Sequence, residues 1–281
     1  MLDYDLHCHS TVSDGMLTPT EVATRAAGRG VRFLALTDHD DVAGLAEAAA
    51  VAAQFGMQFI NGVEISVYTL HIIGLNIDPA HAPLAEGLRN IRTGRGARAK
   101  LMAESLAKAG ISGVLEGAYR YAGNPGLIGR THFARFLVEA GHSKDVKSVF
   151  KNYLVSGKPG YVSHQWASLP EAVSWIVGSG GVAVLAHPGR YTAGRKKMGN
   201  PTLRELLNEF IELGGQGIEV VSGCHTPEQR AEFARYAQEF DLLASCGSDF
   251  HGPGESHQDL GCLPDFPLGC KPVWQAWQAG L

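Results

Sequence analysis

Apolar residues along this chain fall into short strand-like runs separated by longer stretches with helical spacing. Strand-like runs are expected at 4–9, 31–40, 57–66, 69–78, 181–189, 217–223 and 242–251. Helical patterns follow several of them, at 17–30, 41–56, 201–215 and 226–241. About seven strands, nearly all followed by helices, predict a parallel sheet with crossover helices, closed or nearly closed into a barrel. The runs at 57–66 and 69–78 are close enough in sequence to pair as a hairpin.

Polar residues mark where several of these helices begin. Thr18 is a natural N-cap, and Glu21, three residues later, completes a capping box. Ser168 and Glu171 repeat this pattern further along the chain. Asp40 ends the second strand and is positioned to cap the helix expected at 41–56.

The middle of the chain changes character after Asp78. Through Gly180 the pattern is mostly helical, with helices expected at 82–91, 97–110, 130–141, 144–157 and 168–181. We therefore divide the chain into a first barrel part (1–80), a helical insertion (81–165) and a second barrel part (166–281). The chain has 281 residues, 45% of them hydrophobic, which is enough to bury a core of this size.

The insertion is far more basic than the rest of the chain. Between Arg89 and Lys158 there are 13 Lys and Arg against 4 Asp and Glu, a balance of +9, whereas the remainder has 11 against 24, a balance of -13. Together these give the net charge of -4. The asymmetry indicates a basic segment that faces an anionic ligand. The alternative is a helical insertion with an ordinary solvated basic face.

Signals for export and membrane insertion are not apparent in the sequence. No apolar run approaches the ~20 residues of a membrane helix. The first ten residues, MLDYDLHCHS, contain neither the basic nor the apolar region typical of a signal peptide. The five cysteines form an odd set without CxxC spacing. We therefore expect a reduced, cytoplasmic protein that is not bound to a membrane, and no obligate protein partner is evident.

Imidazoles and carboxylates recur where the expected strands end. His7 and His9 project from one side of the first strand, because residues i and i+2 of a strand face the same way. The other candidates are Asp14, His39, Glu64, His71, His187, Asp249 and His251. Barrel enzymes build their sites at the carboxyl ends of strands, although a lone histidine there is usually structural. Six of the 12 histidines, together with three carboxylates, instead predict a metal-binding cluster.

The composition of this cluster narrows its chemistry. Nine nitrogen and oxygen ligands without a thiolate exceed the needs of one tetrahedral zinc and suit two or three divalent ions. The mixture of imidazole and carboxylate favours manganese, zinc, iron or cobalt over magnesium or calcium. Three divalent ions with three carboxylates would leave a charge of about +3, which suits a phosphate dianion better than a neutral amide or ester.

Six short motifs resemble those of a known family. They are HCHS with Asp14, TDHD, GVEIS, HIIGL, AHPG and GSDFH. In this order they resemble the successive motifs of the PHP (polymerase and histidinol phosphatase) family, from His7 to His251 apart from the helical insertion. The resemblance implies an α/β fold, a distorted (β/α)7 barrel, with a centre of three divalent metal ions. Manganese is the first choice for these ions, and zinc, iron or cobalt are the alternatives.

The resemblance also implies how the ligands are shared. One metal would be held by His7, His9, Glu64 and Asp249. Glu64 would bridge to a second metal, bound also by His71 and His187, and the third would be held by Asp14, His39 and His251. His71 is preferred to the nearby His81 because it lies within an apolar run that a barrel strand would turn inward.

Within the family, the stand-alone enzymes with a helical insertion are the most similar. GRTHFARFLVEAG and SGCHTPEQ resemble that branch, which includes phosphatases of 3',5'-nucleotide bisphosphates and nucleases that trim short oligonucleotides from 5' to 3'. We therefore expect a metal-dependent phosphatase that removes the 3'-phosphate of a nucleoside 3',5'-bisphosphate. The alternatives are a 5'-3' exonuclease on short oligonucleotides, a histidinol-phosphate-type monoester phosphatase, and a metal-binding barrel without catalysis. Amide hydrolysis is less consistent with several metals and a basic cap.

Basic residues of the insertion are candidates for binding a second phosphate. They are Arg95, Arg98, Arg130, His132, Arg135 and Lys158, joined by Arg190, which follows the AHPG motif. His132 and Arg135 share a helix face at i and i+3, whereas the glycines around Arg95 are as consistent with a loop as with a helix. Tyr161 or Trp166 is a candidate to stack on a base, with ordinary packing as the alternative.

Two further residues are candidates for roles in the reaction. His225 lies on a loop at the open end of the expected barrel. It could protonate the leaving alcohol or contact phosphate, or it could only cap a helix. Asp38 could orient a metal-bound imidazole by accepting its hydrogen bond.

Overall fold

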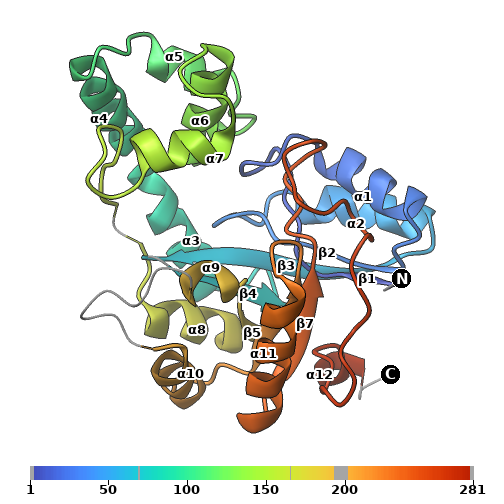
Figure 1. Ribbon diagram of the computed structural model, residues 1–281. Coiled ribbons are helices and arrows are strands. Elements are labelled where there is room, and N and C mark those ends of the chain that lie inside the picture. Colours follow the sequence, from blue (N-terminus) through green and yellow to red (C-terminus); the bar gives the residue numbers. More distant parts are fainter. Residues whose placement is uncertain (1–2, 69, 165, 193–201, 279–281) are drawn as a thin grey trace.

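The computed structural model describes residues 3–68, 70–164, 166–192 and 202–278. Its sheet has seven strands (Figure 1). They are β1 (Tyr4–Asp5), β2 (Phe33–Leu36), β3 (Gln58–Val67), β4 (Leu70–Leu75), β5 (Val182–Leu185), β6 (Gly217–Ser222) and β7 (Leu243–Gly247). The order of the strands in the sheet is their order in the sequence.

Six strands run in one direction, and β4 runs against both of its neighbours. The hairpin expected between β3 and β4 is confirmed, with Ser66 opposite His71. The expectation of a parallel sheet is therefore wrong at β4, because the connection to β3 is too short for a crossover. β1 and β7 nearly close the sheet into the expected distorted barrel, since Leu6 N donates to Cys246 O at 3.0 Å.

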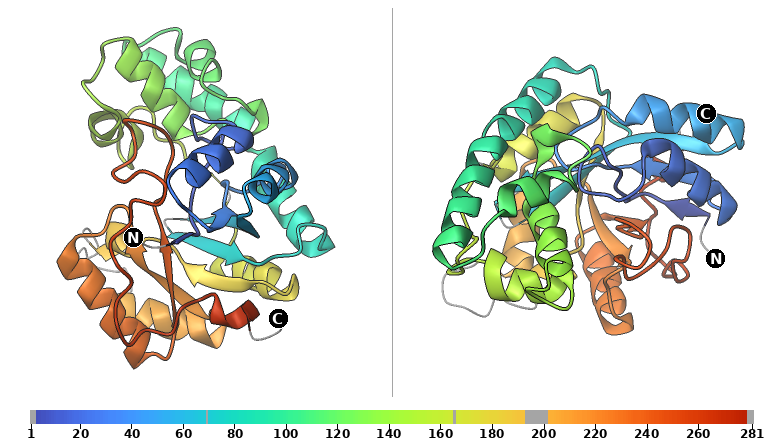
Figure 2. Two further views of the ribbon diagram at one scale, coloured as in Figure 1. Left: turned by 90° about the vertical axis from the view of Figure 1, so that its right-hand side faces the viewer. Right: turned by 90° about the horizontal axis from the view of Figure 1, so that it is seen from above.

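Helices cover the outside of the barrel (Figures 1 and 2). They are α1 (Pro19–Gly28), α2 (Leu45–Gln54), α3 (Ala82–Thr93), α8 (Leu169–Gly178), α10 (Leu203–Glu212) and α11 (Pro227–Glu239). Two short helices are α9 (Gly189–Thr192), which follows β5 at the mouth, and α12 (Gln275–Gln278), which follows β7. The capping boxes expected at the starts of α1 and α8 are confirmed. Buried faces of strands and helices form several hydrophobic clusters, and one of these, the barrel core, includes Ile65, Ile72, Leu207 and Phe210.

The remaining helices form a cap at the barrel mouth, clearest in Figure 2. They are α4 (Arg95–Lys108), α5 (Val114–Tyr119), η1 (Pro125–Leu127), α6 (Arg130–Glu139), α7 (Val146–Val149) and the π-helix η2 (Phe150–Leu154). The cap has its own hydrophobic core, which includes Met102, Phe133 and Leu137. α3, expected to be part of the insertion, instead packs Leu84 and Leu88 into the barrel core. None of the helices in the described ranges is both long and apolar enough to cross a membrane.

Several local expectations are wrong. Asp40 does not cap a helix, because α2 begins only at Leu45 and the Asp40 carboxylate instead accepts hydrogen bonds from Ser66 N and Oγ, at 2.8 and 2.9 Å. The stretch around Arg95 is helical rather than a loop, since α4 starts there. The single helix expected at 144–157 is divided into α7 and η2, and α5 was not expected.

Candidate metal centre and substrate cavity

Six imidazoles and three carboxylates converge at the barrel mouth, and we call these nine residues the ligand cluster. The buried carboxylate of Glu64 is at its centre. Its Oε1 lies 2.9 Å from both His71 Nδ1 and His187 Nε2, and its Oε2 lies 3.0 Å from His39 Nδ1. His71 reaches this mouth because β4 is antiparallel, which places its first residues beside the last residues of β3.

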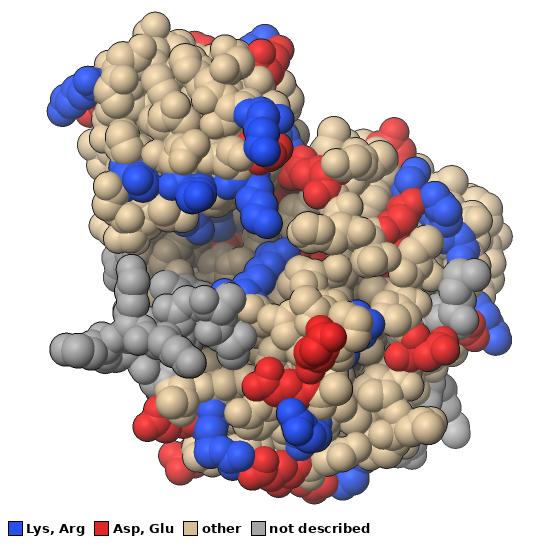
Figure 3. Space-filling model, in the orientation of Figure 1, with Lys and Arg blue, Asp and Glu red and all other residues tan. Residues whose placement is uncertain are grey.

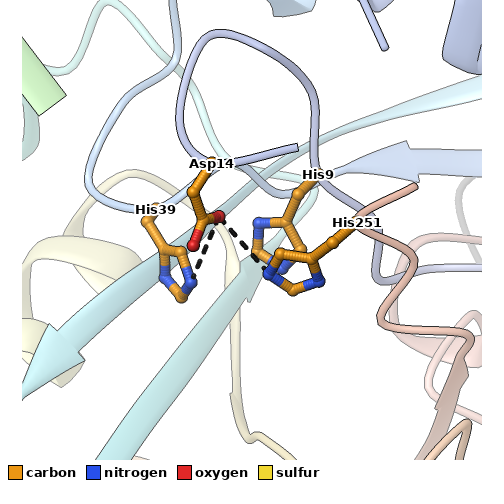
Figure 4. A group of neighbouring side chains, drawn as sticks. All are labelled: His9, Asp14, His39 and His251. Carbon is orange, nitrogen blue, oxygen red and sulfur yellow. Dashed lines mark ion pairs between the residues drawn. The ribbon is translucent and has the colours of Figure 1, made fainter. Parts of the chain in front are cut away.

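Asp14 lies between two imidazoles at one side of the ligand cluster (Figure 4). Its Oδ1 is 3.3 Å from His251 Nε2 and 3.8 Å from His39 Nε2. The His9 ring stacks against both, with ring centroids 4.1 Å from His251 and 4.6 Å from His39. These four side chains come from three separate parts of the sequence, as the strand-end pattern predicts.

Asp249 faces the two histidines that follow β1. Its Oδ1 is 3.4 Å from His7 Nε2 and 3.3 Å from His9 Nε2, and these two Nε2 atoms are only 3.2 Å apart. Asp249 and His187 have positive φ angles of 54° and 25°. Such angles are uncommon for residues other than glycine, and they are found where surrounding contacts impose them, as at functional sites.

The positions of these nitrogen and oxygen atoms suit the binding of cations better than hydrogen bonding to one another. Asp14 Oδ1, Glu64 Oε2 and Asp249 Oδ1 are buried without a hydrogen-bond partner in the described part of the chain, although buried polar atoms normally have one. Four overlapping groups have donor atoms within 4.8 Å of one another: His9, Asp14, His39 and His251; His7, Glu64 and His187; His7, His9 and Asp249; His39, Glu64 and His71. Nitrogen and oxygen donors of this kind suit divalent transition metals.

Contacts within the ligand cluster keep its carboxylates charged. Burial opposes ionisation, but the facing imidazoles outweigh it and hold the pKa of Asp14 and of Glu64 well below the usual range. Burial also opposes the ionisation of Asp249, but Arg190 together with His7 and His251 outweighs it, so the pKa of Asp249 is again well below its usual range. Burial lowers the pKa of His187 to about 4, so its imidazole is in the neutral form that binds metals.

Glu219 was missed by the sequence reasoning, and it supports two of the histidines. It is fully buried in β6, where His7 Nδ1 donates to Oε1 at 3.0 Å and the His187 backbone N–H donates to Oε2 at 2.7 Å. The hydrogen bond from Nδ1 to Glu219 orients the His7 ring so that Nε2 points at the ligand cluster. The signal for Glu219 was an acidic residue inside the apolar run GIEVVSG.

Asp38 has a role different from the expected one. Its carboxylate accepts hydrogen bonds from Ser10 N at 2.8 Å, from Ser10 Oγ at 2.6 Å and from Ser13 Oγ at 2.5 Å. Serines rather than an imidazole therefore occupy its oxygens, contrary to the expectation. Asp38 holds the loop that carries His9 and Asp14.

A basic cavity of about 210 Å³ opens beside the ligand cluster. Four of the seven basic candidates line it together with cluster residues: Arg95, Arg98, Arg130 and Arg190. Figure 3 shows Lys and Arg side chains gathered around the hollow between the cap and the barrel. Arg95 forms an ion pair with Asp40 and Arg190 with Asp249. The charges of these two arginines are therefore partly compensated.

Arg98 and Arg130 have no carboxylate partner in the described ranges. Arg98 Nε donates to a backbone carbonyl at 2.8 Å, and an Arg130 amino group donates to another at 3.4 Å. Burial, together with the neighbouring Arg130 and Arg95, lowers the pKa of Arg98 to about 10, so it stays charged at neutral pH. Trp166 also lines the cavity, and the guanidinium carbons of Arg95 and Arg98 lie 5.1 and 5.4 Å from its ring centroid.

The other substrate-binding and acid candidates do not line this cavity: His132, Arg135, Lys158 and His225. His132 is buried in the cap, where Nδ1 accepts a hydrogen bond from a backbone amide at 3.0 Å. Arg135 forms an ion pair with Glu255 at 2.9 Å. Both ring nitrogens of His225 have backbone partners, at 3.0 and 3.2 Å. The position of His225 therefore gives no support to a general-acid role.

A barrel whose mouth gathers ionised carboxylates and imidazoles beside a basic cavity defines a class, the metal-dependent hydrolases of phosphate esters. Comparison with known proteins then identifies the family. The PHP domain model matches residues 5–222, and the chain therefore belongs to the PHP domain family.

Two relatives and one solved structure match this chain along nearly their whole length. A 3',5'-nucleoside bisphosphate phosphatase from Chromobacterium violaceum is 55% identical over 285 residues, covering 100% of this chain and 98% of the relative. The 5'-3' exoribonuclease Rnm of Escherichia coli is 44% identical over 281 residues, covering 98% of this chain and 94% of the relative. The solved structure of an amidohydrolase from Chromobacterium violaceum, with bound sulfate and no metal, has a TM-score of 0.93 at 54% identity, covering 99% of this chain and 96% of that one.

Proposed function

We propose that this chain is a metal-dependent phosphatase that removes the 3'-phosphate of nucleoside 3',5'-bisphosphates such as adenosine 3',5'-bisphosphate. The products are the 5'-monophosphate and phosphate. The observation that carries the proposal is the cavity in which Arg98 and Arg130 lie beside the ligand cluster without carboxylate partners in the described ranges. Such a cavity suits a substrate with one phosphate to be cleaved and another to be held. Similarity to a bisphosphate phosphatase along the whole chain supports the same substrate class.

Three divalent ions, with manganese as the first choice, are part of this proposal. They would be held by His7, His9, Asp14, His39, Glu64, His71, His187, Asp249 and His251. When bound, such ions lower the pKa of coordinated water and neutralise charge on phosphate oxygens. Zinc, iron and cobalt share the preference for imidazole and carboxylate ligands. We also propose a cytoplasmic location, in which the five free thiols stay reduced.

Residues of the chain itself would orient the substrate. Arg98 and Arg130 would bind the 5'-phosphate through charge-assisted hydrogen bonds, which fix the nucleotide in the cavity. The 3'-phosphate would then face the wall of the cavity formed by Asp14, His39 and His251. Positioning of this kind accounts for much of the rate enhancement in phosphoryl transfer.

The test compares phosphate release from adenosine 3',5'-bisphosphate and from adenosine 3'-monophosphate, with added manganese. We expect the bisphosphate to have the higher kcat/KM. In Arg130→Met this preference should fall by about 10- to 100-fold, because one hydrogen bond to a charged group contributes about 1.5–3 kcal/mol. Arg120→Met is the matched control, since Arg120 pairs with Glu139 at 2.8 Å and is outside the cavity. Equal turnover of both substrates by the wild type would contradict the second-phosphate site and favour a histidinol-phosphate-type monoesterase.

A second candidate function is 5'-3' exonuclease activity on short oligonucleotides. A further cavity of about 530 Å³ adjoins Asp249 and His251 and is also lined by Lys147, which leaves room for a longer leaving group. The Escherichia coli relative carries the name of such an enzyme. A ladder of labelled oligonucleotides separates the two functions by relative rate. Undiminished turnover by Asp14→Ala with normal metal content would remove the ligand cluster from the reaction and revive the alternative of a metal-binding barrel without catalysis.

A further inference from the structure

Helix α6 of the cap contacts the two loops that carry Asp14 and His251. Thr131 Oγ1 donates to Asp14 Oδ2 at 2.8 Å. One turn further along α6, the Arg135 guanidinium donates to the backbone carbonyl of Asp14 at 2.6 Å and to the Glu255 carboxylate at 2.9 and 3.1 Å. Glu255 follows His251 by four residues on the same loop. The cap therefore holds both loops from a single helix face.

Because of the contact with Thr131, the two carboxylate oxygens of Asp14 have different surroundings. Oδ2 accepts the threonine hydroxyl, whereas Oδ1 is buried without a hydrogen-bond partner in the described part of the chain and faces His251 and His39. A carboxylate held in this way keeps one oxygen directed at the ligand cluster (Figure 4). Without the hydroxyl, Oδ2 loses this hydrogen bond, and the side chain can turn Oδ1 away from the ligand cluster.

We propose that Thr131 and Arg135 are positioning residues that complete a metal site formed by Asp14, His39 and His251. The cap would then do more than cover the substrate, because a helix of the cap prepares one of the metal sites of the barrel. This inference rests on the proposed metal-dependent function. Removing a residue that orients a metal ligand through a hydrogen bond typically weakens metal affinity by about 10- to 100-fold.

The test is a titration of manganese into metal-free Thr131→Val, which loses the hydroxyl and keeps the shape of the side chain. We expect about 10- to 100-fold weaker binding at one class of site, with kcat recovering at high manganese. Thr131→Ser keeps the hydroxyl and should bind as the wild type does. Thr93→Val is the control, because within the described ranges the Thr93 hydroxyl bonds only the Arg89 carbonyl at 2.9 Å, in α3.

Arg135→Met is the second variant, and it should weaken the same class of site. If Thr131 and Arg135 contribute only to stability, the variants will have a lower melting temperature without metal and an unchanged manganese titration. This result would overturn the inference. The same unfolding curves show whether each variant is folded. If the wild type itself binds no manganese, zinc, iron or cobalt, the proposed function fails. If the wild type binds metal and both Thr131→Val and Arg135→Met bind it equally tightly, only the role of α6 is rejected.

Discussion

Replacing Glu219 with glutamine tests how the chain orients its metal-binding histidines. Glu219 accepts one hydrogen bond from His7 Nδ1 at 3.0 Å and one from the His187 amide at 2.7 Å, and it is fully buried. Glutamine keeps the shape but exchanges one acceptor oxygen for a donor. Either the His7 Nδ1–H group or the His187 backbone N–H group must then face the amide donor of glutamine, and no water replaces the lost acceptor. A buried donor left without an acceptor costs about 1–3 kcal/mol of folding stability.

The same substitution should weaken metal binding. Burial opposes a charged His7, but Glu64, Glu219 and Asp249 outweigh it and hold the pKa of His7 well above its usual value. Removing the negative charge behind Nδ1 makes Nε2 a poorer electron donor. Loss of such a partner typically lowers metal affinity or activity by about 10- to 100-fold, which corresponds to about 1.4–2.7 kcal/mol.

Two measurements check these magnitudes. Denaturant unfolding of the metal-free protein reports the stability cost, and manganese titration followed by metal analysis reports the affinity. Glu205→Gln is the matched control, because Glu205 belongs to the exposed capping box of α10, in which glutamine also serves. A Glu219→Gln variant that binds manganese as tightly as the wild type would refute the reasoning. A loss of stability alone would reduce Glu219 to a structural residue.

Three further predictions concern stability. Burial holds the pKa of His132 at about 4 instead of 6.5. The stabilisation from its neutral form is therefore present above pH 6.5 and is lost as the pH falls towards 4, by about 1.4 kcal/mol per pH unit. Denaturant unfolding at several pH values checks this, because in His132→Gln the free energy of unfolding should lack this part of its dependence on pH. Asp40→Asn leaves the buried Arg95 charge without its partner and should cost about 3–5 kcal/mol; calorimetry showing an unchanged melting temperature would contradict this. Gly87→Ala places a methyl group 2.6 Å from a tryptophan ring of α8 and should cost about 1–3 kcal/mol. At Gly28 an added methyl group meets no atom of the described residues within 4 Å, so Gly28→Ala should not destabilise the protein.

The sequence alone determined the class of fold and the residues that gather at the mouth. Strand-like runs that mostly end in histidine or carboxylate, nearly all followed by a helix, leave few arrangements other than a barrel with one polar rim. Capping boxes such as Thr18 with Glu21 located helix starts correctly, because their signal lies within one turn of the chain. The unusual charge of the insertion likewise pointed to the cavity that Arg98 and Arg130 line.

Only the tertiary structure decided which partner each of these residues meets. Asp38 and Asp40 looked like an imidazole partner and a helix cap, yet they bond serines from other segments. Glu219 lies 212 positions from His7 and Thr131 lies 117 from Asp14. Periodicity along a chain indicates which way a side chain faces, but it does not indicate which residue of another segment will contact it. That depends on strand order, on the reversal at β4 and on how the cap is seated, and all three are set by long-range packing.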